Sequence, residues 1–201
     1  MRTPSNSAYS DAQLDALREL ANVASGTAAT ALAQMLGQEV GLNVPDVHAL
    51  ALADAARVIG LGEAAIDGVL LPLIGDIAGT VALILPQETA GVLCGMLGVD
   101  AGDEVGVSAL REVGNILGCS YLGALGQMTG LSLEPAPPEH VRDDAATVVA
   151  EMLAPLAAAS GMALVLQSAL SLGGQAHSIS FLLLPTDGHV DALLAPLGLA
   201  D

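Results

Sequence analysis

The chain of 201 residues has the length of one ordinary domain, or of two small halves that share one core. Hydrophobic residues make up 53% of it and charged residues only 13%, which provides a substantial core and argues against general disorder. The 22 acidic and 5 basic residues give a net charge of −17. This charge disfavours binding to nucleic acid or to an anionic membrane and favours a partner with a basic site.

Neither the start of the chain nor its longest apolar region predicts a membrane segment. The first twenty residues lack the apolar core of a signal peptide, and the region 64–85 is interrupted by two aspartates and a proline. We therefore expect a cytoplasmic protein. Cys94 and Cys119 have no spacing typical of a zinc site or a disulfide framework. The histidines also lack metal-ligand spacing, and we expect surface or turn positions for His48, His140, His177 and His189.

Two long helices are expected, over 11–36 and 104–129, and each is followed by a glycine suited to a helix C-terminus. A turn that contains Pro45 is expected after the first helix. Extended segments are expected over 48–53, 68–74, 79–85, 164–172 and 177–184, and shorter helices over 87–97, 143–158 and 187–197. Because short turns join consecutive strands, we expect antiparallel pairing and a mixed α/β fold of the α+β kind.

The second half of the chain repeats the first. At a shift of 93 positions, Ala16–Glu19 falls on Ala109–Glu112, and eleven residues between 16 and 45 are identical without a gap. The segment 81–86 resembles 180–185 at a shift of 99, which indicates a small insertion in the second half. Convergence of two Ala/Leu-rich helices is the alternative explanation, but it does not account for the matching Arg, Glu, Asn, Gln and Pro residues.

The repeat predicts one domain, 1–201, with internal pseudo-two-fold symmetry. Its two repeats are expected at about 11–97 and 104–197, with residues 1–10 as a flexible N-terminus. A chain of this length is too short for two independent cores, so the halves should share one.

Each long helix places polar residues on the face opposite its apolar stripe. Asp15, Glu19 and Asn22 are spaced i, i+4 and i+7, so they are aligned and expected to be exposed. The corresponding residues of the second helix are Ser108, Glu112 and Asn115. The residues expected to face the sheet are Leu14, Leu17, Ala21, Ala24, Ala28, Ala31 and Met35 in the first helix, and Leu110, Gly114, Leu117, Tyr121, Ala124 and Met128 in the second.

A solvated helix surface is the simplest explanation of these polar residues, but three details favour a docking surface. Asp15 and Glu19 are like charges at i, i+4, which slightly destabilises a helix. Asparagine is a poor residue for a helix interior, yet it recurs at the same place in both halves. The exposed stripe then continues through small residues, which let another protein lie close: Gly26, Ala29, Ala33, Cys119, Gly123 and Gly126.

A carboxylate and an amide one helical turn apart are an incomplete set of catalytic groups. Two ligands are too few for a dedicated metal site, so we expect no metal or cofactor of the protein's own. An amide can orient a water for in-line attack, and a carboxylate can bind a lysine of a partner. The set makes most sense if the rest of the active site, with any metal, belongs to that partner.

Three neighbours of these residues are harder to interpret. Arg18 and Arg111 flank the motif glutamates, either to support the helices or to set the docking angle of a basic partner. Cys119 lies on the same face, where we expect a small packing residue rather than a reactive thiol.

The pattern Asp/Ser-x3-Glu-x2-Asn-x22-Pro occurs twice, ending at Pro45 and at Pro138. Together with the segments ATALAQMLG (29–37) and SALREVGNILGCSYLGALGQMTGL (108–131), it resembles the CheC family of chemotaxis phosphatases, relatives of CheX and FliY. The resemblance covers nearly all of the chain after the first ten residues or so. Two copies of the motif favour CheC over CheX, which has one such site per chain.

The resemblance implies hydrolysis of the aspartyl phosphate on the chemotaxis response regulator CheY. Asn22 and Asn115 would enter the regulator's active site and orient the attacking water. Glu19 and Glu112 would pair with the regulator's active-site lysine. The Mg²⁺ would be the regulator's own.

The resemblance also implies supporting residues, a fold and partners. Asp15 and Ser108 would support the two sites from one turn earlier. The family fold is a pseudo-two-fold arrangement of an antiparallel sheet and two exposed motif helices, and the receptor deamidase CheD is a second implied partner. We expect a monomer.

Two other functional hypotheses remain. A CheC-like adaptor would dock CheY or CheD with negligible catalysis, but the intact Glu/Asn pair in both halves favours the enzyme. A structural protein with two exposed acidic helices would leave the repeated asparagine unexplained.

Overall fold

The computed structural model describes residues 10–59, 64–144, 147, 148, 150, 162–186 and 195. Its elements are, in chain order, α1 (Asp11–Leu36), β1 (Val40–Ala51), α2 (Leu52–Ile59), β2 (Ala65–Gly75), β3 (Gly79–Pro86), α3 (Gln87–Met96), α4 (Glu104–Thr129), β4 (Leu133–Pro135), β5 (Glu139–Asp144), β6 (Met162–Leu172) and β7 (Gln175–Pro185). The expected flexible segment 1–10 lies outside the described residues except for Ser10. The expected helix 187–197 lies outside them except for residue 195.

The two long helices have the predicted bounds because their ends carry capping residues. Ser10 Oγ accepts a hydrogen bond from the Gln13 N–H, and Gln13 Oε1 accepts one from the Ser10 N–H, which closes a capping box at the start of α1. Asp103 caps α4 by accepting from a backbone N–H of its first turn. Gly37 and Gly130 end the helices in the left-handed conformation, with φ of 67° and 74°.

Seven strands of the described part of the chain form one antiparallel sheet in the order β1-β6-β7-β3-β2-β4, and β5 also pairs with β2. The order is symmetric about the central β3–β7 pair, because β2 and β6 flank that pair and short or irregular strands lie outside them. First-half strand β1 pairs with second-half strand β6, and second-half strands β4 and β5 pair with first-half strand β2. The halves thus share one sheet. This confirms the duplicated antiparallel fold, while the repeat boundaries 11–97 and 104–197 stay a prediction.

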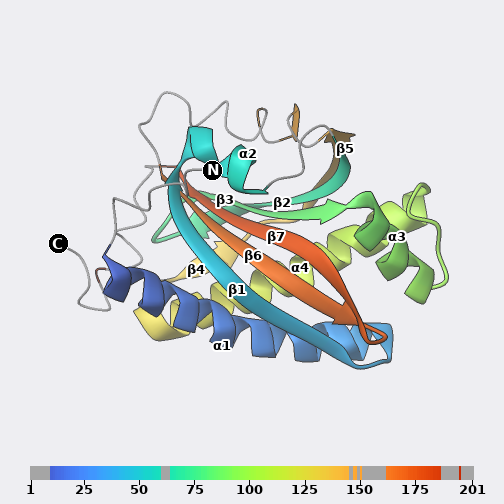
Figure 1. Ribbon diagram of the computed structural model, residues 1–201, viewed down its shortest axis with the longest axis horizontal. Helices are drawn as coiled ribbons and strands as arrows, with labels where there is room; N and C mark the ends of the chain where they lie inside the picture. The colour runs from blue at the N-terminus through green and yellow to red at the C-terminus, as the bar shows by residue number, and fades with distance from the viewer. Residues whose placement is uncertain are drawn as a thin grey trace.

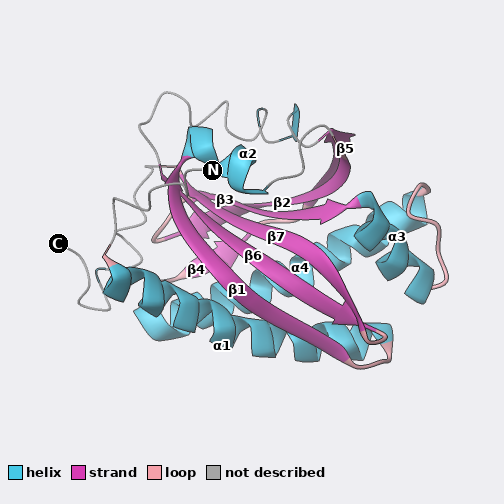
Figure 2. Cartoon of the chain, in the orientation of Figure 1, coloured by secondary structure: helices cyan, strands magenta, loops and turns pink. Residues whose placement is uncertain are grey.

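Helices cover both faces of this sheet. Helices α1 and α4 lie side by side across one face, and α2 lies on the other (Figure 1, Figure 2). The central strands are apolar on both sides: in β3, Leu83 and Leu85 pack in the core beneath α1 and α4, whereas Ala82 and Ile84 pack in the core on the α2 side. The larger core therefore fixes the orientation of the two motif helices.

Two expectations about the elements are wrong. Strand β1 begins at Val40, so Pro45 lies within a strand rather than in a turn. This strand is at the edge of the sheet, and its register with β6 shifts between Asn43 and Asp46, where a proline without an N–H is tolerated. The helix expected over 143–158 starts too early, because residues 143 and 144 end β5 and pair with the start of β2, whereas the described residues 147, 148 and 150 are helical. Helix α2 was not expected.

Candidate functional site

The polar residues of both motifs lie on the outer faces of α1 and α4. Asp15, Glu19, Asn22, Ser108 and Glu112 are exposed, and Asn115 is half-buried. All six are therefore accessible, as the helical spacing predicts.

The opposite faces hold the helices on the sheet. Leu17, Leu110 and Leu117 are at most 1% exposed. Gly114 brings α4 into close contact with β2, since a methyl group built on it would lie 2.4 Å from Val69 Cγ1. The backbone that carries Glu112 and Asn115 is thus seated directly against the sheet.

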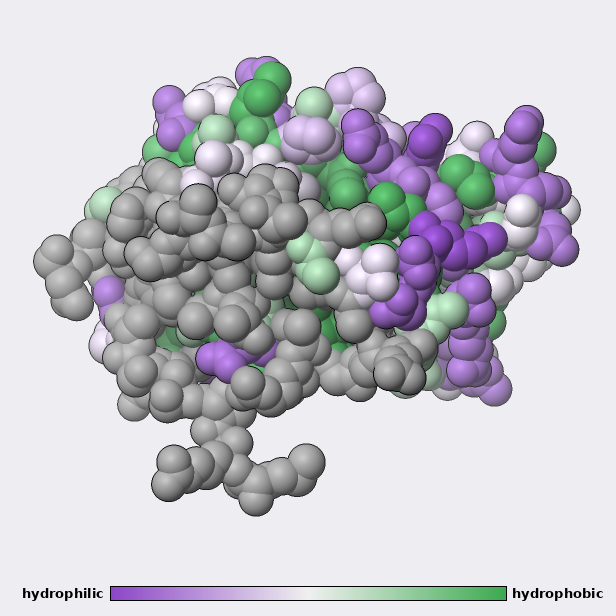
Figure 3. Space-filling view, turned by 90° about the horizontal axis from the view of Figure 1, so that it is seen from above, coloured by the Kyte–Doolittle hydropathy of each residue, from purple (hydrophilic) through white to green (hydrophobic). Residues whose placement is uncertain are grey.

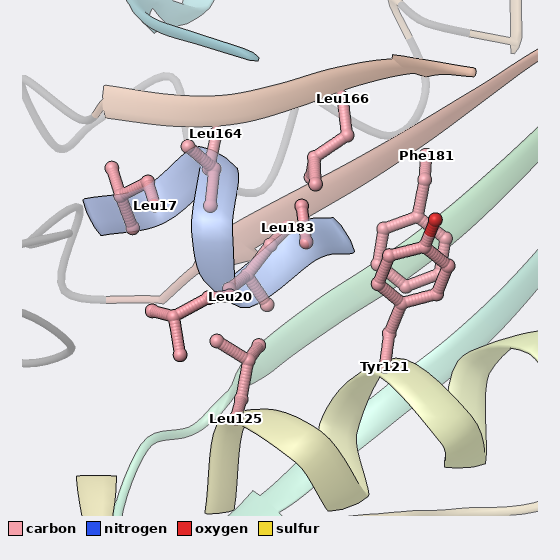
Figure 4. Close-up of a pocket in the computed structure, with 9 residues that line it drawn as sticks. Leu17, Leu20, Tyr121, Leu125, Leu164, Leu166, Phe181 and Leu183 are labelled. Atoms are coloured by element: carbon pink, nitrogen blue, oxygen red, sulfur yellow. The ribbon is translucent and has the colours of Figure 1, made fainter. Parts of the chain in front are cut away.

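Ser25 and Tyr121 connect the two helices. Their hydroxyl oxygens are 2.7 Å apart, and Ser25 Oγ donates to the Ala21 carbonyl, which leaves Tyr121 as the donor to Ser25. The Tyr121 ring stacks on Phe181 of β7, with the ring centroids 4.4 Å apart (Figure 4). Burial raises the pKa of Tyr121 above its ordinary value, and the hydrogen bond with Ser25 opposes this rise only in part.

Apolar side chains close the space behind the motif faces (Figure 4). The cavity left between the two helices and the sheet has a volume of about 10 Å³, close to the smallest space that holds one water. Its lining residues are Leu17, Leu20, Ala21, Tyr121, Leu125, Leu164, Leu166, Phe181 and Leu183. The motif residues are therefore accessible from the outer surface and not from this cavity.

The two motif sets form separate sites. Helices α1 and α4 run in opposite directions (Figure 1). Accordingly, Leu17 from the first half of α1 lines the same cavity as Leu125 from the second half of α4. The motif residues lie in the first half of each helix, so the two sets are at opposite ends of the helix pair.

The first site contains Asp15, Glu19 and Asn22. Asp15 Oδ1 forms an ion pair with Arg18 Nη1 at 2.5 Å, with the Asp15 side chain largely exposed and the Arg18 side chain about half exposed. An exposed pair of this kind contributes little stability, but the contact favours the helix-supporting role considered for Arg18. Within the described residues, Asn22 makes no side-chain hydrogen bond, so its amide is free to contact a partner.

The second site, Ser108, Glu112 and Asn115, has different contacts. Ser108 Oγ donates to the Glu104 carbonyl at 2.9 Å. The Cys119 thiol donates to Asn115 Oδ1, with 3.4 Å between sulfur and oxygen. Although Cys119 is an exposed residue, partial burial of its thiol, and then the negative charge of Glu112, raise its pKa, which keeps the thiol protonated at neutral pH. The sequence identified Cys119 only as a packing residue, although its spacing of four from Asn115 could have indicated this contact.

A buried charged cluster lies near the start of α4. Asp67 on β2 is 1% exposed, and its Oδ1 accepts a hydrogen bond from Arg142 Nε at 2.8 Å and lies 2.7 Å from His140 Nε2. Arg142 Nη2 also donates to the Ala101 carbonyl at 2.6 Å, in the loop that leads into α4. The signal in the sequence was an aspartate within an apolar segment, together with a histidine and an arginine two residues apart on a strand.

Two expected exposures are wrong. The side chain of His140 is 7% exposed rather than on the surface, because β5 pairs with β2 and brings it to Asp67. Met128 is 42% exposed rather than buried, because Thr129 faces the core in the last turn of α4. Of the other histidines, His48 and His177 are half-buried on strands, and His189 lies outside the described residues.

Hydrophilic side chains gather at the end of the molecule that carries α3 and the start of α4 (Figure 3). Asp100, Asp103 and Glu104 are exposed there. No group of three or more His, Cys, Asp or Glu side chains that could hold a metal ion occurs in the described part of the chain. That part also contains no helix with the length and apolar character needed to cross a membrane.

Both motif helices lie almost entirely in regions of the chain that match a known protein family. The model of the CheC-like family matches residues 13–48 and 105–142. The CheY-P phosphatase CheC of Bacillus subtilis (strain 168) is 30% identical over 198 residues, which cover 92% of this chain and 94% of that protein. The chain belongs to the CheC-like family. Both matched regions contain a complete Glu/Asn pair, so this CheC-like protein carries the motif twice.

Solved structures share the CheC-like architecture. FliY of Thermotoga maritima matches with a TM-score of 0.75 at 18% identity, covering 95% of this chain and 96% of that chain. The CheX–CheY–BeF3–Mg²⁺ complex of Borrelia burgdorferi matches with a TM-score of 0.52 at 18% identity, covering 86% of this chain and 98% of that chain. These likenesses confirm the expected fold class.

Proposed function

We propose that this CheC-like protein is a phosphatase that hydrolyses the aspartyl phosphate of the response regulator CheY. The proposal is carried by the accessible Glu/Asn pairs, Glu19 with Asn22 and Glu112 with Asn115, on helices whose other faces are held in the core. It is supported by the Bacillus subtilis relative, which is named a CheY-P phosphatase. The cytoplasm is the compartment in which such a protein would meet CheY.

Each asparagine would orient the attacking water. An accepting amide oxygen turns a water so that its lone pair points at phosphorus, in line with the bond to the aspartyl oxygen. The water oxygen bonds to phosphorus as that bond breaks, which releases inorganic phosphate with the proton and restores the carboxylate. Asn22 and Asn115 are suited to this role because both are accessible and lie on helices whose inner faces are packed in the core.

Docking would depend on charge. Glu19 and Glu112 would each pair with the active-site lysine of the regulator, and the net charge of −17 would steer a basic surface toward them. The Mg²⁺ would belong to the regulator, consistent with the CheX–CheY complex that contains BeF3 and Mg²⁺. Asp15 and Ser108 would support the sites one turn earlier, through their contacts with Arg18 and the Glu104 carbonyl.

The protein would act as a monomer, since each site is complete on one helix. CheD would be a second partner, as the resemblance to the CheC family implies.

The test is the lifetime of phosphorylated CheY with the wild-type protein, with Asn22→Ala, with Asn115→Ala and with the double variant. The double variant should lose nearly all activity, and the single variants should keep unequal shares, because the contacts around the two sites differ. Loss of an orienting group costs on the order of 10²-fold in rate. Asn43→Ala is the matched control, because Asn43 is an exposed asparagine on β1, outside both Glu/Asn pairs.

Circular dichroism should show that every variant is folded, since both motif asparagines are accessible. A folded double variant that works at the wild-type rate would refute the role of the amides. A wild-type protein that binds CheY without shortening its phosphate lifetime would instead establish the adaptor function.

A further inference from the structure

The two sites differ in one side chain next to the motif amide. At the 93-residue shift, Cys119 of α4 occupies the place of Gly26 of α1. Each residue lies four positions after the motif asparagine, so both are one turn along the same helix face. The thiol of Cys119 donates to Asn115 Oδ1 over 3.4 Å, whereas Gly26 offers Asn22 no side chain.

We propose that Cys119 is a positioning residue that holds the Asn115 amide in its working orientation, so that the second site is pre-organised and the first is not. This inference rests on the proposed phosphatase function. A carbonyl oxygen has two lone pairs. The thiol uses one lone pair of Oδ1 and leaves the other for the attacking water.

The surroundings of the thiol suit a donor rather than a nucleophile. Burial and the charge of Glu112 raise the pKa of Cys119, and only the protonated thiol can donate to an amide oxygen. The exposures of the asparagines agree with this difference, because Asn115 is half-buried and Asn22 is exposed.

Pre-organisation should affect turnover more than docking. A side chain that already occupies the productive rotamer loses less freedom when the complex forms, and a free amide is competent only for a fraction of the time. A thiol is a weak donor. We therefore expect the contact to raise kcat at the second site by about twofold to fivefold and to leave KM nearly unchanged.

The experiment isolates the second site in the Asn22→Ala background and measures kcat and KM for dephosphorylation of CheY. Adding Cys119→Ala should lower kcat by about twofold to fivefold, and Cys119→Ser, which keeps a donor, should retain most of it. Ser120→Ala is the matched control, because the Ser120 hydroxyl lies on the adjacent helix position and donates to the Ile116 carbonyl rather than to an amide side chain.

The reciprocal experiment isolates the first site in the Asn115→Ala background and adds Gly26→Cys. A methyl group built on Gly26 has no atom within 4 Å, so the new side chain fits without strain. The kcat of the first site should then rise, which a merely structural role of Cys119 does not predict.

An unchanged kcat for Cys119→Ala, or an effect on KM alone, would overturn the positioning role. The double variant Asn22→Ala/Asn115→Ala separates this failure from that of the proposed function. If the double variant is inactive while Cys119→Ala has wild-type kcat, only the positioning role fails. If the double variant is fully active, the amide mechanism itself fails.

Discussion

Gly114→Ala adds a single methyl group where α4 meets the sheet. The new Cβ would lie 2.4 Å from Val69 Cγ1 and 2.7 Å from Val69 Cβ, about 1 Å closer than ordinary van der Waals contact. Overpacking of this kind costs about 1–3 kcal/mol, and the better helix propensity of alanine returns about 1 kcal/mol. Because two atoms of Val69 would lie within 3.0 Å, the cost should fall in the upper part of that range, at about 2–3 kcal/mol, which leaves a net loss of about 1–2 kcal/mol in the free energy of unfolding.

The measurement is equilibrium denaturation by urea, in which the midpoint should fall while the slope is unchanged. Gly91→Ala is the matched control, because Gly91 lies within α3 on an exposed face and a methyl group built there has no atom within 4 Å. This control should be neutral or stabilised by up to about 1 kcal/mol.

A second readout is the coupling between Gly114 and Val69. Val69→Ala makes room for the new methyl group, so the double variant should lose less stability than the sum of the two single losses. The second site should also lose activity, because a shift of α4 by about 1 Å displaces Asn115, and such misplacement can cost on the order of 10²-fold in rate. Wild-type stability of Gly114→Ala, or strictly additive losses, would refute the claim that α4 is seated against β2 without free space.

Three further outcomes are expected. Arg142→Ala should destabilise the protein by about 2–4 kcal/mol in thermal or chemical denaturation, because it leaves the buried Asp67 carboxylate with His140 as its remaining partner. A loss below about 0.5 kcal/mol would show that the carboxylate does not need the guanidinium. The raised pKa of Tyr121 means that its contribution to stability is complete below the ordinary tyrosine pKa and is lost as the pH rises through the folded-state value. Tyr121→Phe should therefore flatten the fall of unfolding free energy above about pH 10, and an identical fall in both proteins would contradict this assignment. Association with CheY should weaken as salt rises, because the net charge is −17; binding that is independent of salt would assign the affinity to the small-residue stripe instead.

Local chemistry explains what the sequence could predict. The bounds of α1 and α4 depend on groups within one turn of each end, such as the αL glycines Gly37 and Gly130. Helical periodicity alone predicts that Leu17 lies on the buried face of α1 and that Asn22 lies on its exposed face. The repeat presents the motif twice, so helical spacing and duplication together are enough to name the candidate site residues.

Strand pairing determined the features that the sequence did not predict. The partner of a strand is distant in the sequence, and the residue pattern of the strand does not specify it. Pairing of β5 with β2 buries His140 beside Asp67, against the expected surface position, and the exchange of outer strands joins the two halves into one sheet. The tertiary structure also sets α1 and α4 in opposite directions across the β6–β7 face, which separates the two Glu/Asn pairs into independent sites. Helical periodicity assigns a face to each side chain, but only packing against a common sheet decides how two such faces lie relative to each other.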